Sequence, residues 1–262
     1  MFFELSDAGG GELLMIHYHG LPITPATAAR AAITGGHAFV SFRYPDQLSL
    51  AIDVCQSFAV DNGAFSAWKS GTPVTDWNRY YEWVADLHRC PLFDFAVIPD
   101  VIDGDEQAND ALLAEWPWRG TPKNGWIGSP VWHMHESIDR LQRLSREWPR
   151  VSIGSSGQFK TVGNARWWGR MTEAMNSICD KQGRPVCKLH GLRMLNPEVF
   201  SKLPFSSADS TNIARNIGID KAWHGSYTPT GKDVKAIVMR SLIESHQAMS
   251  FWTKRPAQVE LI

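Results

Sequence analysis

The stretch Leu203–Asn212, LPFSSADSTN, carries the pattern on which the predicted fold depends. An apolar run leads into small hydroxyl residues and one carboxylate, Asp209, and a helix-like segment follows. Two other stretches repeat this order: FAVDNGAF ends its apolar run at Asp61, and FAVIPD ends its run at Asp100. A strand that ends in this way delivers an acid to the mouth of a cleft, where a following helix start supplies oriented N–H groups. Three such acids indicate a site built from strand ends.

Short apolar runs alternate with helical patterns along the whole chain. The runs predicted as strands are residues 12–18, 37–42, 57–60, 93–98, 130–132, 151–153, 186–190 and 203–208. This alternation predicts a parallel sheet with helical crossovers, and eight repeats predict closure into a single-domain (β/α)8 barrel of TIM type over residues 1–262. A doubly wound open sheet is the main alternative, although no GxGxxG turn follows the first strand.

Composition narrows the class of protein. Hydrophobic residues make up 44% of the chain and charged residues 20%, which is typical of a globular protein. The net charge of −1 gives no general attraction to nucleic acid, so such a role needs a local basic face, with Lys160, Arg166, Arg193 and Arg215 as candidates. The four cysteines form no CxxC pair, and no signal peptide or membrane-spanning run is visible. We therefore expect a soluble, cytoplasmic protein with reduced cysteines.

Each strand-end motif also has a purely structural interpretation. Asp61 could cap a turn instead of taking part in chemistry. Asp100 lies in an acid-rich loop, but that loop lacks the spacing of an EF-hand. The turn Gly154-Ser155-Ser156-Gly157 could present backbone N–H groups to a phosphate or a carbonyl oxygen, or it could be a simple tight turn. These alternatives stay open on the residues alone.

The sequence His17-Tyr18-His19 supports a rival hypothesis. An HxH at the end of a first barrel strand resembles the metal-dependent amidohydrolases, and His133, His190 and Asp209 could complete a Zn²⁺ site that activates water. Against this, the fourth strand supplies Asp100 where that family commonly has a bridging lysine. A third class, a barrel that binds nucleic acid without catalysis, also fits the basic residues.

Taken in order, the motifs resemble the tRNA-guanine transglycosylase superfamily, and within it the shorter DpdA-type enzymes of phages and bacteria that place 7-deazaguanine bases in DNA. Residues 61–65 resemble its Asp-Ser-Gly-Gly-Phe/Tyr motif, which implies proton transfer by Asp61 and stacking of Phe65 on the base. Pro99-Asp100 resembles the acid that reads the guanine edge, and Asp209 matches the final-strand nucleophile. The resemblance covers roughly residues 40–216.

The same resemblance implies further substrate contacts. Gly154, Ser155 and Ser156 stand where the family uses backbone groups on the purine carbonyl, and His190 with Gly191 stands where a side chain covers the other face of the base. Trp132-His133-Met134-His135 replaces the family's Gln-Gly element, so we expect Trp132 and His133 to contact the base, with His133 or His135 reading it. The chain has no cysteine beyond Cys187 and so lacks the family's CxCxxC zinc motif, which favours DNA over tRNA.

The resemblance implies a retaining base exchange that needs neither a metal nor another cofactor. Asp209 would attack C1′ of the sugar while guanine leaves, and Asp61 would handle the protons. The implied partners are guanine-containing DNA and a free 7-deazapurine of the preQ0 type, with tRNA-guanine exchange as the alternative within the family.

Overall fold

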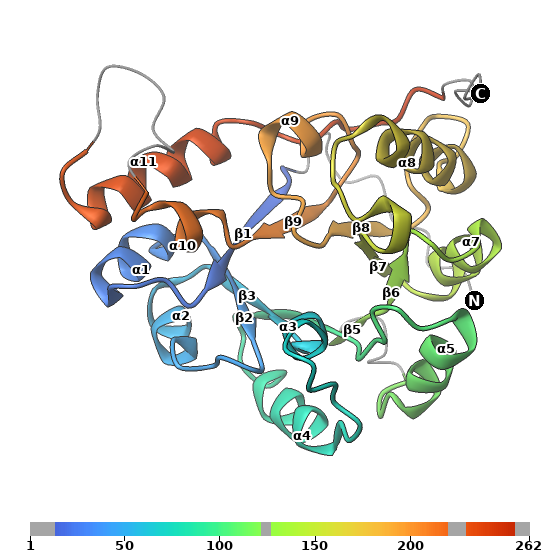
Figure 1. Cartoon of the computed structure of the whole chain (residues 1–262), viewed down its shortest axis with the longest axis horizontal. Helices are drawn as coiled ribbons and strands as arrows, with labels where there is room; N and C mark the ends of the chain where they lie inside the picture. The colour runs from blue at the N-terminus through green and yellow to red at the C-terminus, as the bar shows by residue number, and fades with distance from the viewer. Residues whose placement is uncertain (1–13, 122–126, 220–228, 255–262) are drawn as a thin grey trace.

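The computed structural model describes residues 14–121, 127–219 and 229–254, and it confirms the predicted barrel (Figure 1). Nine strands form one sheet in the order β5-β4-β3-β2-β1-β9-β8-β7-β6, and neighbouring strands in this order pair in parallel. The helices cover the outer face of this sheet. The strands are β1 Ile16–Leu21, β2 His37–Ser41, β3 Ser57–Asp61, β4 Phe93–Val97, β5 Gly128–Ser129, β6 Val131–His133, β7 Arg150–Gly154, β8 Lys188–Gly191 and β9 Ser207–Ser210.

The helices follow the strands in the order expected of βα repeats. They are α1 Ala26–Ile33, α2 Leu48–Val54, α3 Ala64–Lys69, α4 Asn78–Leu87, α5 Glu106–Glu115, α7 Ile138–Glu147, α8 Ala165–Ile178, α9 Pro197–Phe200, α10 Asn212–Asn216 and α11 Lys232–Glu244. Side-chain caps fix several starts: Asp105 accepts from the N–H of Ala108, and Ser137 accepts from the N–H of Arg140.

Pro130 explains why the structure has nine strands where the sequence predicts eight. It separates β5 from β6, and these two short strands occupy one place in the barrel. β5 pairs with β4, whereas β6 pairs with β7. Proline has no N–H to contribute to a ladder, so the strand is interrupted there. The carbonyl of Pro130 still accepts from Ser152 N at 2.8 Å, and Ser129 Oγ lies 2.8 Å from Ser152 Oγ, which holds the two sides of the break together.

Two apolar cores follow from the alternation of side chains along the strands. The barrel interior holds Tyr18, Phe39, Ala59, Phe95, Val97 and Val131. A larger core between the sheet and the helices includes Trp132, Trp167, Met171 and Trp116. Many of the tryptophans are therefore packing residues of the outer layer rather than binding groups.

The N-terminal ends of the strands contain a cluster of hydrogen-bonded polar groups, although Arg150 Nε has no partner in the described part of the chain. The Tyr18 hydroxyl donates to Asp94 Oδ2 at 2.5 Å, and Arg150 Nη2 donates to Asp94 Oδ1 at 3.1 Å. The Arg150 guanidinium also lies 4.0 Å from the centre of the Phe95 ring. Burial alone would raise the pKa of Asp94, but the Arg150 charge and the two hydrogen bonds outweigh burial and lower it. This end of the barrel is closed by paired groups.

Several boundaries differ from the sequence-based prediction. The first strand runs on to Leu21 instead of ending at Tyr18, and residues 12 and 13 of the predicted strand lie outside the described part of the chain. The last helix ends at Glu244 instead of continuing to Trp252. The four cysteines are free thiols. Among the described helices, none has the length and apolar character needed to cross a bilayer.

Candidate active site

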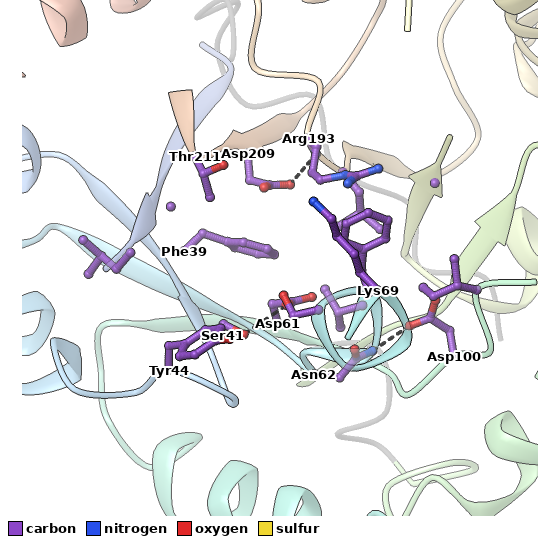
Figure 2. A pocket seen from close by; sticks show the side chains of 18 of the residues that line it. Phe39, Ser41, Tyr44, Asp61, Asn62, Lys69, Asp100, Arg193, Asp209 and Thr211 are labelled. Carbon is purple, nitrogen blue, oxygen red and sulfur yellow. Dashed lines mark hydrogen bonds between the residues drawn. The ribbon is translucent and has the colours of Figure 1, made fainter. Parts of the chain in front are cut away.

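A cavity of about 510 Å³ opens at the carboxyl ends of the strands (Figure 2). Parallel strands bring their C-terminal ends to one face of a barrel, so groups far apart in the sequence meet there. All three predicted strand-end acids line this cavity. The other polar and aromatic lining residues include Phe39, Ser41, Tyr44, Asn62, Phe65, Lys69, His133, Ser155, Arg193, Thr211 and Arg215.

Asp61 ends β3 and is held by the turn that follows it. Its Oδ2 accepts from Gly63 N at 3.1 Å and from Ser41 Oγ at 3.3 Å. Gly63 has φ +81°, a left-handed conformation that suits glycine, and the chain turns there into α3. Burial, with smaller contributions from Asp209 and Asp100, raises the pKa of Asp61 to about 7. A carboxyl with this pKa can give or take a proton near neutral pH.

Asp209 on β9 faces the same cavity in a different environment. Its Oδ1 accepts from the backbone N–H of Arg193 at 2.8 Å and lies 3.3 Å from His190 Nε2. Arg193 has φ +57° and is the only described residue other than glycine with a positive φ. This unusual backbone conformation accompanies the turn after β8 that directs the N–H towards Asp209.

Asp100 is held from two sides. Asn62 Nδ2 donates to Asp100 Oδ1 at 2.8 Å and to the carbonyl of Ile98 at 2.9 Å, while Asn62 Oδ1 accepts from Ala64 N at 2.7 Å. On the other side, His133 Nε2 lies 2.9 Å from Asp100 Oδ2. The pair is close, but neither ring nitrogen of His133 has an aligned hydrogen-bond partner in the described part of the chain. His133 lines the cavity, but both of its ring nitrogens are buried.

Phe65 and three cationic side chains surround the opening. The Arg193 guanidinium lies 3.7 Å from the centre of the Phe65 ring, which is cation–π contact. Lys69 on α3 and Arg215 on α10 also line the cavity, and Figure 2 shows Arg193 beside Asp209 and Lys69 among the acids. A flat, electron-rich ring and anionic groups attached to it fit such a lining.

The structure brings together only part of the predicted site. The cavity is lined by Asp61, Asp209, Phe65, Asp100, His133, Gly154, Ser155, Arg193 and Arg215. It is not lined by Trp132, Ser156, His190, Gly191, Lys160 or Arg166.

Trp132 and Gly191 illustrate the physical reason for these exclusions. Trp132 alternates with the inward-facing Val131 and His133, packs in the outer core and donates to the carbonyl of Ser137 at 2.9 Å. A Cβ on Gly191 would meet the Phe205 ring at 2.6 Å, so Gly191 packs closely against its neighbours instead of contacting a ligand.

The remaining exclusions have similar causes. Ser156 Oγ lies 2.7 Å from His135 Nδ1, away from the cavity lining. His190 is fully buried among Tyr18, Phe39 and Phe95, beneath the cavity. Lys160 and Arg166 are exposed on the segment after β7 and on α8. A contact with more distant parts of a large ligand is the only role the geometry leaves for these two.

The structure does not assemble the histidine set of the amidohydrolase hypothesis. Because β1 spans Ile16–Leu21, His17 and His19 lie within the strand and on its outer side, whereas Tyr18 between them points into the barrel. His17 Nε2 lies 2.9 Å from the carbonyl of His246, and His19 Nε2 lies 3.0 Å from Glu244 Oε1. Among the described residues, no group of three or more His, Cys, Asp or Glu side chains is arranged to hold a metal ion.

Sequence reasoning missed six polar groups of the cavity: Ser41, Tyr44, Asn62, Ser66, Lys69 and Thr211. Asn62 directly follows Asp61, and an amide next to a strand-end acid is a signal that could have been used. Lys69 had no such signal, because its position depends on α3, a helix that the apolar pattern did not indicate.

A scan against protein-family models, a search of curated proteins and a search of solved structures found no match to this chain.

Proposed function

We propose that this protein is a base-exchange transglycosylase that replaces guanine in DNA with a 7-deazaguanine base. The observation that supports this most is the pairing of Asp209 and Asp61 in one cavity in contrasting environments. Both acids accept a backbone N–H, but Asp209 also lies 3.3 Å from the imidazole of His190, whereas Asp61 has a pKa raised to about 7. One acid is thus suited to attack as a carboxylate, and the other to transfer protons.

In the first half of the proposed reaction, an Asp209 oxygen forms a bond to C1′ of the deoxyribose as the bond from C1′ to guanine breaks. The bonding electrons leave with the guanine, which takes a proton from Asp61. A covalent ester between Asp209 and the sugar results, as in retaining glycosidases.

In the second half, the incoming 7-deazaguanine gives its proton to the Asp61 carboxylate and attacks C1′. The bond between C1′ and Asp209 breaks, and its electrons return to the carboxylate. Atoms and charges balance over the two halves, and the configuration at C1′ is retained because the carbon is attacked twice.

The lining of the cavity suits recognition of a guanine-like base. A base would stack on the Phe65 ring where the Arg193 guanidinium now lies, 3.7 Å from the ring centre, so Arg193 would have to move off that face. The carboxylate of Asp100 can accept from the N–H groups of a guanine edge. His133 would have to turn its ring for a nitrogen to reach a polar atom of the base, because both nitrogens are buried and have no aligned protein partner among the described residues. The target base would have to leave the helical stack to enter, and Arg193, Lys69 and Arg215 are placed to meet phosphates.

Incubation of the protein with guanine-containing DNA and labelled preQ0-type base tests this proposal. We expect label to enter the DNA and one guanine to be released for each label incorporated. A parallel incubation with tRNA separates the two branches of the resemblance, because label in tRNA alone would favour the tRNA reaction. Binding of DNA without any label or released guanine would indicate a non-catalytic barrel and overturn the proposal.

A further inference from the structure

His190 lies directly beneath the cavity, on β8, and is fully buried. Its ring packs at 5.0 Å from the Phe95 ring and at 5.3 Å from the Phe39 ring, centre to centre. It does not line the cavity, so it has no access to a bound base. A histidine buried in an aromatic interior, close to the proposed nucleophile, needs an explanation other than substrate contact.

The two ring nitrogens of His190 face two polar partners on β9. Nδ1 lies 2.9 Å from Ser207 Oγ, and Nε2 lies 3.3 Å from Asp209 Oδ1. Ser207 and Asp209 are two residues apart on β9, so their side chains lie on the same face of the strand and both meet His190. Burial lowers the pKa of His190, which favours the neutral ring. A neutral ring that accepts from Ser207 through Nδ1 carries its proton on Nε2, the nitrogen that faces Asp209.

The two oxygens of Asp209 are therefore not equivalent. Oδ1 receives the backbone N–H of Arg193 at 2.8 Å and lies 3.3 Å from His190 Nε2, a contact that is close but falls short of an aligned hydrogen bond. Within the described part of the chain, no group donates to Oδ2. An oxygen without donors keeps its lone pairs for a new bond, whereas an oxygen held by donors is fixed in place.

We propose that His190 is a positioning residue for Asp209, which together with the Arg193 N–H fixes Oδ1 and leaves Oδ2 as the oxygen that attacks the sugar. This inference rests on the proposed base exchange. When Oδ2 bonds to C1′, Oδ1 becomes the carbonyl oxygen of the ester and keeps the Arg193 N–H and the contact with His190 Nε2. When the ester breaks, the negative charge returns to a carboxylate that these donors stabilise.

Substitution of His190 separates a donor role from simple packing. His190→Leu removes the Nε2 donor, whereas His190→Gln places an amide N–H at a similar distance along the side chain. We expect adduct formation with DNA to slow about 10- to 100-fold in His190→Leu, with unchanged DNA affinity, and to recover to within about 10-fold of wild type in His190→Gln.

His37 on β2 provides a matched control. His37 Nδ1 lies 2.8 Å from Ser57 Oγ, so this pair repeats the contact between His190 and Ser207, but His37 does not line the cavity. His37→Leu should leave the adduct rate within about twofold of wild type. Equal rates for His190→Leu and wild type would overturn the inference, whereas no adduct with any of the proteins would overturn the proposed function instead.

The pH profile adds a readout that packing alone would not move. Loss of a donor to Oδ1 disfavours the charged carboxylate, so the acid limb of adduct formation should shift to higher pH in His190→Leu and not in His190→Gln. The charged groups around the pair are Arg150 and Asp94 on the inner side of His190, and Asp61, Arg193 and Arg215 on the side of the cavity. They are the same in all variants, so a shift between variants reports the lost donor. If the acid limb of His190→Leu lies at the same pH as that of wild type, His190 does not act as a donor to Asp209.

A measurement on the unaltered protein covers the case in which the variants do not fold. Nitrogen NMR of histidine-labelled protein distinguishes which ring nitrogen carries the proton. We expect a neutral His190 with the proton on Nε2 at pH 7. A proton on Nδ1 alone would leave Asp209 without this donor and would overturn the inference, whether or not base exchange is observed.

Discussion

Asp94 and Asp61 lie at opposite ends of neighbouring strands, β4 and β3, and their pKa values move in opposite directions. Burial favours the protonated form of both. At the N-terminal end, Arg150 and the Tyr18 hydroxyl reverse that effect and lower the pKa of Asp94. At the cavity end, no cation is paired with Asp61 within salt-bridge distance in the described chain, and neighbouring acids add to burial, so its pKa rises to about 7.

The comparison shows how one barrel separates stability from chemistry. At the N-terminal end, Asp94 is held in hydrogen bonds from Tyr18 and Arg150. The cavity end leaves acids without paired cations, which costs stability but keeps them available for proton transfer and attack. Substitution of an acid at the cavity end should therefore affect chemistry most, and substitution of Asp94 should affect stability most.

Asp209→Asn is expected to lower the rate of base exchange more than any other substitution. The substitution preserves the shape of the side chain but removes the nucleophile, so base exchange should fall by at least about 1,000-fold. Incorporation of labelled base into DNA measures the rate, and a binding assay with the same DNA checks that affinity is retained. Exchange at the wild-type rate would show that Asp209 is not the nucleophile.

Asp61→Asn should reduce exchange by about 100-fold, because an amide cannot transfer a proton at neutral pH. In wild-type protein the two halves of the reaction should respond to pH in opposite ways. Adduct formation uses protonated Asp61 and should slow as the pH rises through about 7, whereas attack of the incoming base uses the carboxylate and should accelerate. Single-turnover measurements of each half at pH 6 and pH 8 check this, and parallel responses of the two halves would contradict the assignment.

Asp94→Ala should leave chemistry largely intact and destabilise the fold by about 2 kcal/mol, because Arg150 loses its carboxylate partner. The side chain of Asp94 is 25% exposed, so the loss should be smaller than for a fully buried pair. Chemical denaturation measures the effect, with Asp46→Ala, an exposed acid, as the control. Because the folded-state pKa of Asp94 is lowered, the difference from wild type should shrink as the pH falls below about 4.

The smallest expected effect is an increase in stability, caused by Asp61→Asn. The folded-state pKa of Asp61 lies above its unfolded value, so ionisation of Asp61 opposes folding as the pH rises from about 4 to 7. Asp61→Asn removes this cost and should stabilise the protein by about 1 kcal/mol at pH 8, with little gain at pH 4. Thermal unfolding at the two pH values measures the difference. A variant that is less stable than wild type at pH 8 would indicate that Asp61 is held by its hydrogen bonds more strongly than burial opposes it.

The sequence predicted the barrel because its βα alternation is regular, and it predicted Asp61, Asp100 and Asp209 because each follows an apolar run. The grouping of strand-end acids can be predicted without knowing the strand register, because parallel strands bring their C-terminal ends together in any case. For residues within a strand, the face on which the side chain lies does depend on the exact strand boundary. Trp132, Gly191, His17 and His19 each alternate with inward-facing neighbours, and a shift of one residue in a strand boundary moves a side chain to the other face.

Contacts between distant segments could not be predicted at all. The cation–π contact of Arg193 with Phe65 and the position of Lys69 depend on how α3 and the turn after β8 lie in space. The link between His190 and Asp209 likewise depends on the pairing of β8 with β9. These are tertiary features that no local pattern encodes.

Mass spectrometry of the protein after incubation with guanine-containing DNA, with the incoming base withheld, tests the central claim most directly. The account predicts a covalent deoxyribosyl adduct on the peptide that contains Asp209, and its loss in Asp209→Asn. It also predicts that the adduct disappears when a 7-deazaguanine base is added. An adduct on another residue, or exchange that proceeds with Asn at position 209, would contradict the account.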